Sequence, residues 1–188
     1  MLFRSERATP GAEASSAAAG LLSPLGETST MPFARLAIES WRRYPDVVAE
    51  LRDRTGIDVE YVTRGTIHPL ATAEDVRNAG LRLRHEWARE MGIEAWDVGD
   101  VRSREPSLSG DVRGAMFVRG DHWVNNQRLV VAYAQAAVST GVAVMTGTPV
   151  SRVIVEDGHA RGVVADGERY DADAVLLAAG AWTAALAE

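Results

Sequence analysis

The most constraining feature of the sequence is a run of nearly side-chain-free residues close to its start, GAEASSAAAGLL at positions 11–22. The run predicts a short helix with Ser15 and Ser16 near its beginning and Gly20 near its end. Small side chains let another molecule approach the backbone, and the free N–H groups of a first helical turn favour an anion, typically a phosphate. Gly20 permits a left-handed or tight exit from the helix. The alternative interpretation is an alanine-rich helix that packs against a neighbouring element.

Composition limits the classes of protein to which the chain can belong. Its 188 residues are 46% hydrophobic and 24% charged, as in ordinary globular proteins, and are enough for one large or two small domains. A net charge of -6 argues against nucleic-acid binding, and the absence of cysteine excludes disulfides and thiolate metal sites. His85 and Glu86 lack the second histidine of a zinc-binding helix, so no metal site is expected. No stretch has the apolar length of a membrane span or the apolar core of a signal peptide, so the prediction is a cytoplasmic protein.

The first residues suggest the end of a strand from a nucleotide-binding unit. Residues 2–3 are apolar, Glu6 follows, and a loop through Pro10-Gly11 leads to the small-residue run. In a dinucleotide-binding βαβ unit the second strand ends in an acid that binds the adenosine ribose. Glu6 is placed for that role, although it can also be an ordinary surface glutamate. The glycine fingerprint and the first strand that would precede it are absent, so the chain is expected to begin within a longer fold.

The middle of the chain has helical periodicity interrupted by short strand patterns. Pro45 is expected to kink or split the first helix. His122 can be interpreted as a catalytic residue or, since the sequence offers it no partner, as an ordinary loop histidine. The expected elements are helices over 29–54, 73–91, 100–108 and 127–139, strands over 57–62, 66–70 and 112–118, and a turn over 120–123.

After residue 141 short strands alternate with turn signals. Asp157-Gly158 and Asp166-Gly167 are hairpin turns, which predicts a β-meander over 150–155, 161–165 and 168–170 after a strand at 142–145. Residues 173–182 have a continuous apolar centre, as expected for a strand buried on both faces. Gly180 then leaves space for a ligand at the carboxyl end of that strand. A helix is expected to begin at Trp182.

In this order and spacing, the segments resemble the D-amino-acid-oxidase-like family of FAD-dependent oxidoreductases, and most strongly its glycine-oxidase branch. The resemblance spans the whole chain. It is carried by Glu6 with Pro10-Gly11, the run at 14–22, residues 114–130, Gly141 through Thr148-Pro149-Val150, and 174–182 ending in Gly180-Ala181-Trp182. It implies a mixed α/β fold: a partial Rossmann-like FAD-binding domain, made of 1–22 and 126–188, and an inserted α+β substrate domain at 23–125.

The resemblance also implies which residues contact the FAD cofactor. By position they are Glu6 and Arg7 at the ribose, Ala14 and Ser15 at the pyrophosphate or ribityl chain, Ala19, Gly20 and Leu21 with their backbone against the flavin ring, Val150 at the adenine through its main chain, and Gly180 beneath the cofactor. The family's GxGxxG loop and its substrate-carboxylate arginine have no counterpart here. No catalytic acid, base or nucleophile is therefore assigned.

The activity that the resemblance implies is oxidation of a small amino acid or amine. A hydride passes from the α-carbon to the flavin, the imine hydrolyses, and molecular oxygen reoxidises the flavin with formation of hydrogen peroxide. One alternative is a related flavoenzyme that acts on an N-methyl amino acid or a 2-hydroxy acid. Another is a truncated, non-catalytic product that holds no FAD. Assembly into a homo-oligomer is left open.

Overall fold

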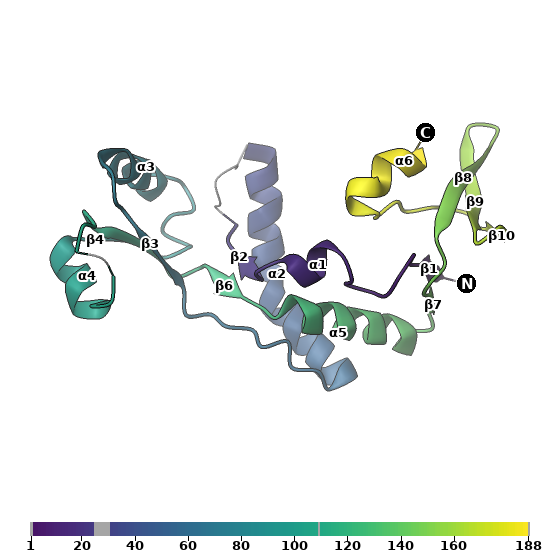
Figure 1. Ribbon diagram of the computed structural model, residues 1–188, viewed down its shortest axis with the longest axis horizontal. Helices are drawn as coiled ribbons and strands as arrows, with labels where there is room; N and C mark the ends of the chain where they lie inside the picture. Colours follow the sequence, from purple (N-terminus) through teal and green to yellow (C-terminus); the bar gives the residue numbers. More distant parts are fainter. Residues whose placement is uncertain (1, 25–30, 109, 188) are drawn as a thin grey trace. The chain divides into compact units, whose positions relative to one another are not determined.

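The computed structural model describes residues 2–24, 31–108 and 110–187, and these form two compact units. The first unit comprises 1–17, 51–57 and 127–188, and the second comprises 18–50 and 58–126. Helices and strands alternate irregularly along the chain in both units (Figure 1), which confirms the mixed α/β class. The assignment of a cofactor domain and a substrate domain to particular ranges stays a prediction.

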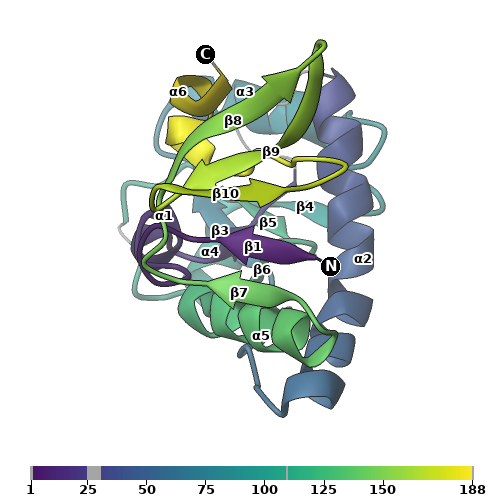
Figure 2. The same cartoon turned by 90° about the vertical axis from the view of Figure 1, so that its right-hand side faces the viewer.

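In the first unit, the beginning of the chain is paired with a strand near residue 144. β1 (Phe3–Ser5) lies parallel to β7 (Ala143–Met145), with Phe3 opposite Ala143, and β7 follows α5 (Asn126–Ser139). Figure 2 shows β1 and β7 side by side. Glu6 therefore follows the end of a strand, as predicted.

The three-stranded meander of the first unit is confirmed. β8 (Val150–Glu156), β9 (His159–Ala165) and β10 (Glu168–Asp171) form an antiparallel sheet in the order β10-β9-β8 (Figure 2). Both connecting turns have positive φ at each central residue: 52° and 75° at Asp157 and Gly158, and 50° and 80° at Asp166 and Gly167. This is the backbone of a type I′ turn, whose twist matches that of the strands it joins.

The buried strand predicted over 173–182 is not present. Residues 174–179 form no strand, and the Leu176 side chain is 91% exposed. The chain then enters a 3-10 turn, η1 (Gly180–Trp182), and a short helix, α6 (Thr183–Ala187). A strand buried on both faces needs hydrogen-bonding neighbours, and the described residues bring none to this segment. The apolar composition of this segment alone was therefore not enough to predict a strand.

The second unit is built on a three-stranded antiparallel sheet. β5 (Ala115–Val118) lies between β3 (Thr66–Pro69) and β4 (Ile93–Trp96). Its helices are α3 (Ala73–Leu83), α4 (Val98–Arg104) and most of α2 (Met31–Thr55). The part of α2 that belongs to this unit ends at Glu50. A capping box formed by Thr72 and Asp75 begins α3, and the Asp97 side chain caps α4.

The sheet of the second unit has two different faces, because side chains alternate along each strand. On one face, Met116 and Val118 pack with Ile38 of α2, Ala79 of α3 and Met91; we call it the helix-covered face. On the other, the aromatic face, Ile67 and Phe117 lie opposite each other and Trp96 lies opposite Ala115. Val101 of α4 covers part of the aromatic face beside Trp96.

Several predicted elements of the second unit differ from the structure. Residues 57–61 form no strand because Glu60 has a φ of 55°, which breaks the extended run before the single bridge from Val62 to Trp123. The helix expected over 73–91 ends at Leu83, and the one expected over 100–108 lies at 98–104. The predicted turn at 120–123 includes a short strand, β6 (His122–Trp123), which pairs with β2 (Leu21–Leu22).

The long helix α2 begins at Met31, and positions 29–30 of the predicted helix lie outside the described residues. The helix continues through Pro45 to Thr55 as one element, so Pro45 does not split it, and the alternative expectation of a kink stays a prediction. Proline removes only one backbone hydrogen bond, to the carbonyl four residues earlier, and Pro45 is exposed, so its ring displaces no core residue.

Pro45→Ala is expected to raise the free energy of unfolding by about 1 kcal/mol. Alanine restores the missing helical hydrogen bond and removes the helix penalty of proline, which is roughly 3 kcal/mol. The unfolded alanine variant is more flexible than the unfolded parent chain, and this entropy offsets part of the gain in stability. Urea denaturation followed by circular dichroism measures the change. The neighbouring exposed substitution Asp46→Ala is the control and should shift the midpoint little. A less stable Pro45→Ala variant would contradict this account.

Candidate functional site

The segment after β1 carries the predicted ribose-binding acid. The Glu6 N–H donates to the Met145 carbonyl at 2.8 Å, and the Glu6 carbonyl accepts from the Thr148 N–H at 3.0 Å. Its carboxylate receives the Ala8 N–H at 3.4 Å and lies 3.7 Å from the Arg4 guanidinium. The Glu6 side chain is 22% exposed, so the backbone is fixed by the sheet while the carboxylate still reaches solvent.

Arg7 brings the two ends of the chain together within the first unit. Its guanidinium forms an ion pair with Glu13, just before the small-residue helix, and lies 4.0 Å above the Trp182 ring. A guanidinium over an indole face is a favourable cation–π arrangement. These contacts bring Arg7 close to residues 13 and 182, which adjoin the predicted cofactor residue Ala14 and the turn that begins at the predicted cofactor residue Gly180.

The small-residue helix is shorter than its composition suggested. α1 (Ala14–Ala17) has four residues, with Ala14 exposed and Ser15 half-buried. The Ser16 hydroxyl donates to the Ala12 and Glu13 carbonyls at 3.1 and 2.7 Å, so it serves its own turn rather than a ligand. A four-residue helix has little macrodipole, so an anion here would depend on individual N–H groups and on Ser15.

Gly180 and Val150 complete the predicted cofactor residues of the first unit. Gly180 has a φ of 55°, and a β-carbon added to it would meet no atom within 4 Å. Val150 opens β8 and pairs with Ala165, half-buried in the sheet. The open space beside Gly180 is compatible with a flat ligand near the backbone. The backbone of Val150, by contrast, is paired with a neighbouring strand of the sheet.

The remaining predicted cofactor residues, Ala19, Gly20 and Leu21, belong to the second unit. The Ala19 carbonyl accepts a hydrogen bond from the Trp123 indole, and Leu21 pairs with Trp123 in the β2–β6 ladder. Gly20 is buried with a φ of 83°, and a β-carbon there would lie 2.0 Å from the Val124 carbonyl oxygen. The nearby Val124 backbone is therefore enough to explain why position 20 requires a glycine. A contact between Gly20 and the flavin stays a prediction.

A buried carboxylate in the second unit was missed by the sequence interpretation. Asp121, at the turn after β5, is 1% exposed and accepts the Thr66 hydroxyl at 2.5 Å, and His68 Nε2 lies 3.1 Å from the same carboxylate oxygen. Burial raises the pKa of Asp121, but hydrogen bonds from His68, Thr66 and Ser23 outweigh burial and hold the pKa below its usual value. Among the described residues Oδ1 has no hydrogen-bond partner. The Gly120-Asp121-His122 motif was the available sequence signal.

His122 is not the unpartnered loop histidine that the sequence suggested. It lies in β6, its Nδ1 is 2.6 Å from the Tyr61 hydroxyl, and its ring centroid is 5.6 Å from that of Trp41. Burial lowers the pKa of His122 and raises that of Tyr61, so at neutral pH a protonated phenol is hydrogen-bonded to a neutral imidazole. The missing signal was Tyr61, which lies 61 residues away in the sequence.

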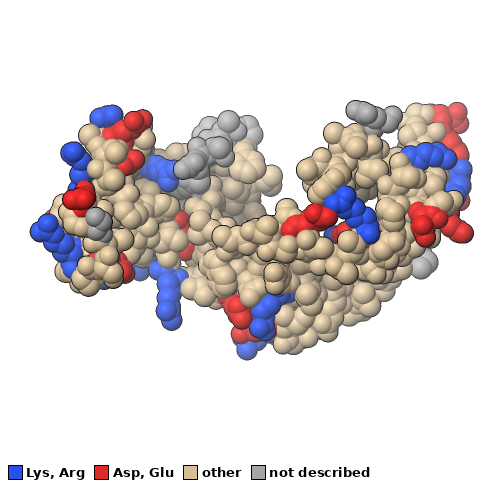
Figure 3. Space-filling model, in the orientation of Figure 1, with Lys and Arg blue, Asp and Glu red and all other residues tan. Residues whose placement is uncertain are grey.

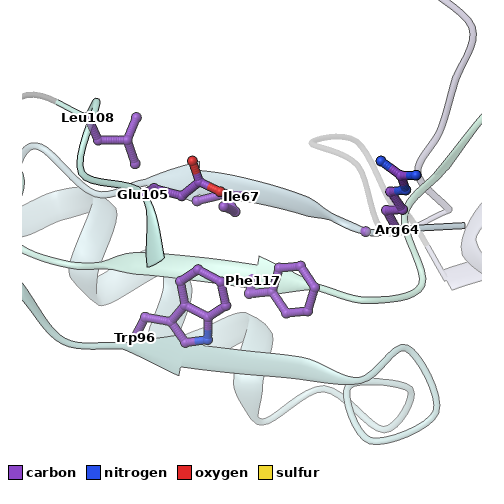
Figure 4. A pocket seen from close by; sticks show the side chains of 7 residues that line it. Arg64, Ile67, Trp96, Glu105, Leu108 and Phe117 are labelled. Atoms are coloured by element: carbon purple, nitrogen blue, oxygen red, sulfur yellow. The ribbon is translucent and has the colours of Figure 1, made fainter. Parts of the chain in front are cut away.

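The second unit also contains an open pocket of about 460 Å³ on the aromatic face. Figure 4 shows Trp96 and Phe117 along one side of the pocket, Ile67 and Glu105 next to each other, Arg64 at one end and Leu108 at the other. The rings of Trp96 and Phe117 are stacked with centroids 4.9 Å apart and an interplanar angle of 17°. The surface elsewhere is mixed in charge: acidic and basic side chains alternate on the face in Figure 3.

Comparison with known proteins defines the class to which this fold and these segments belong. The sequence model of the family described as FAD dependent oxidoreductase matches residues 5–188. The chain therefore belongs to this family of FAD-dependent oxidoreductases, as the resemblance implied.

The individual relatives to which the chain is similar include glycine oxidases. The chain is 37% identical over 185 residues to glycine oxidase of Geobacillus kaustophilus, covering 96% of the chain and 48% of that protein. It is 31% identical over 180 residues to glycine oxidase of Bacillus subtilis, covering 95% and 47%. The crystal structure of the Geobacillus kaustophilus enzyme superimposes with a TM-score of 0.86 at 34% identity over 97% of this chain and 49% of that one.

The chain spans about half the length of the curated relatives it matches. In the described part of the chain, no helix is both long and apolar enough to cross a membrane.

Proposed function

We propose that this chain contributes part of the FAD site of an oxidoreductase acting on a small amino acid or amine. The observation that carries the proposal is the 37% identity to a glycine oxidase over 96% of the chain. The arrangement of the first unit supports it, because Glu6, Arg7 and Trp182 lie in one region. Gly180, two residues before Trp182, has no atom within 4 Å of a β-carbon added to it. The backbone there is therefore accessible to a flat ligand.

In this proposal each cofactor residue that the resemblance implies contacts a particular part of FAD. Glu6 and Arg7 bind the ribose region, Ala14 and Ser15 the phosphate or ribityl region, Val150 the adenine through its main chain, and Gly180 leaves room for the cofactor. Ala19, Gly20 and Leu21 present backbone to the flavin. FAD supplies the hydride acceptor, and this chain supplies binding and orientation.

The finer features of the activity belong to the same proposal. They are hydrolysis of an imine product, molecular oxygen as electron acceptor with release of hydrogen peroxide, and a cytoplasmic location. The alternatives keep the cofactor but change the substrate to an N-methyl amino acid or a 2-hydroxy acid. A chain that folds and holds no FAD is the non-catalytic alternative.

Titration of the purified chain with FAD tests the proposal directly. Saturable quenching of flavin fluorescence, with Trp182 fluorescence changing at the same concentrations, is expected if the first unit holds the cofactor. A colourless protein that takes up no added FAD would support the non-catalytic alternative.

Gly180→Val is expected to weaken FAD binding at least tenfold while leaving the fold intact. The added side chain occupies the open space beside the backbone but meets no protein atom at its β-carbon, so the cost to folding is only the strain of a positive φ, about 1 kcal/mol. Gly147→Val, with a φ of 65° and nothing within 4 Å of its β-carbon, is the matched control and should retain FAD. Equal FAD affinity in the two variants would refute the placement of Gly180 at the cofactor.

A further inference from the structure

An exposed row of apolar side chains crosses the small sheet of β2 and β6 in the second unit (Figure 1). Trp123 lies in the middle of the row. It pairs with Leu21 on one side, and on the other its backbone exchanges hydrogen bonds of 2.8 and 2.9 Å with Val62. Residues directly opposite each other in antiparallel strands project their side chains to the same face. Leu21, Trp123 and Val62, which we call the apolar row, therefore share one face, and they are 51%, 37% and 38% exposed.

The opposite face of the same two strands is covered by protein. Leu22 pairs with His122, and both side chains are half-buried. The His122 ring lies against the Trp41 ring of α2, with the two centroids 5.6 Å apart. Side chains alternate between the two faces along a strand, so the apolar row faces away from α2. It is therefore the face of this sheet on which a ligand can lie.

The indole of Trp123 is held beside the segment for which a flavin contact is proposed. Its N–H donates to the Ala19 carbonyl, and its nitrogen lies 3.0 Å from the position of a β-carbon added to Gly20. An indole that is already fixed by a hydrogen bond loses little conformational freedom when a ligand covers its ring. The apolar row is therefore continuous with residues 19–21, and its largest side chain is oriented before any ligand binds.

We propose that the flavin ring of FAD lies on the apolar row and that Trp123 is a further flavin-contacting residue. This inference rests on the proposed function, in which Ala19, Gly20 and Leu21 contact the ring. The isoalloxazine ring system of a flavin is planar, tricyclic and uncharged when oxidised. Separations of about 4.5 and 5.5 Å between opposite residues make the row roughly 10 Å long, which is comparable to such a ring system. Contact with the indole buries apolar area and adds an aromatic interaction.

Two fragments of FAD separate this inference from the proposed function. FMN carries the flavin ring without the adenosine half, and ADP carries the adenosine half without the ring. The indole N–H signals of the five tryptophans, recorded by NMR on the full 188-residue chain, report on each fragment separately. Trp123 lies in the apolar row, whereas Trp182 lies beside Arg7, for which a ribose contact is proposed. FMN is expected to shift the Trp123 signal saturably and to leave Trp182 unchanged, and ADP should do the reverse.

The outcomes of the two titrations are distinguishable. Absence of a saturable Trp123 shift with FMN overturns the inference, whatever ADP does. Equal shifts of Trp123 and Trp182 with FMN also overturn it, because they indicate unspecific stacking on exposed tryptophans. A Trp123 shift with FMN supports the inference even if ADP has no effect, and the failure of ADP then contradicts only the proposed ribose contacts of Glu6 and Arg7.

Substitutions in the apolar row provide the second comparison, with FMN affinity measured by quenching of FMN fluorescence. Trp123→Phe identifies the Trp123 signal and should weaken FMN binding at least threefold, because the indole and its bond to Ala19 are lost. Val62→Thr replaces one methyl group by a hydroxyl and should weaken binding about threefold, the equivalent of one buried methyl group. Val155→Thr, at an exposed valine of β8, is the matched control and should bind FMN like the parent chain. Parent-like FMN affinity in both row variants, with the remaining indole signals unmoved, would refute the contact.

Discussion

Gly20→Ala is expected to lower the free energy of unfolding by about 3 kcal/mol. The added β-carbon would lie 2.0 Å from the Val124 carbonyl oxygen and 3.0 Å from the Trp123 indole nitrogen. The buried Val124 carbonyl cannot move away without disturbing the hydrogen bond next to the β2–β6 ladder, in which the Gly20 carbonyl accepts the Val124 N–H at 3.0 Å. Forced overpacking of this kind costs roughly 1–3 kcal/mol, and a positive φ at a non-glycine residue adds about 1 kcal/mol.

Gly141→Ala is the matched control for this prediction. Its φ of 88° is close to the 83° of Gly20, but a β-carbon there meets nothing within 4 Å. Urea denaturation should therefore show a loss of about 1 kcal/mol for Gly141→Ala, from backbone strain alone. If the two variants unfold at the same urea concentration, the close approach of Gly20 to Val124 is wrong.

The same comparison separates two explanations of Gly20. A glycine required only for a flavin contact would leave the stability of the FAD-free chain unchanged beyond the backbone strain. Loss of FAD in a Gly20→Val variant therefore carries no information about the cofactor unless the FAD-free variant is shown to be folded. Gly180 is the better position at which to test cofactor contact, because its surroundings are open.

Asp121→Ala is the second substitution with a large expected effect, a loss of about 2–4 kcal/mol. The carboxylate is 1% exposed and accepts from Thr66 at 2.5 Å, with His68 at 3.1 Å. Alanine removes the buried acceptor that the Thr66 hydroxyl and His68 Nε2 share and leaves these two groups only each other, at 2.9 Å; each hydrogen bond to a charged group contributes about 1.5–3 kcal/mol. Asp46→Asn, on the exposed surface of α2, is the control and should change stability little.

The pH dependence of Asp121→Asn distinguishes a buried charge from a merely polar contact. The pKa of Asp121 is lowered in the folded protein from a usual value of 3.8, so its carboxylate stabilises the fold above that value and loses this contribution as the pH falls through the folded pKa. The stability difference between the parent chain and Asp121→Asn should therefore shrink as the pH is lowered from about 5 to about 2. A difference that is constant over this range would contradict an ionised Asp121.

Local chemistry was enough to predict part of the fold. The hairpins at Asp157-Gly158 and Asp166-Gly167 follow from residues that tolerate positive φ, and helix α5 follows from an uninterrupted apolar periodicity. Glu6 at the end of β1 was predicted because strand endings carry short sequence signals. In each case the residues that decide the structure are neighbours in the sequence.

Contacts between distant residues decided the rest. The run at 174–179 has a strand-like composition but lacks a neighbouring strand in the described structure, and α2 tolerates Pro45 because the ring faces outward. Asp121 and His68 are 53 residues apart, and Tyr61 and His122 are 61 apart, so no local pattern pairs them. The sequence by itself determined the turns, most helices and the family. Only the tertiary structure determined that Gly20 faces the Val124 carbonyl and that Asp121 is a buried charge, because burial and close approach depend on residues that folding brings together.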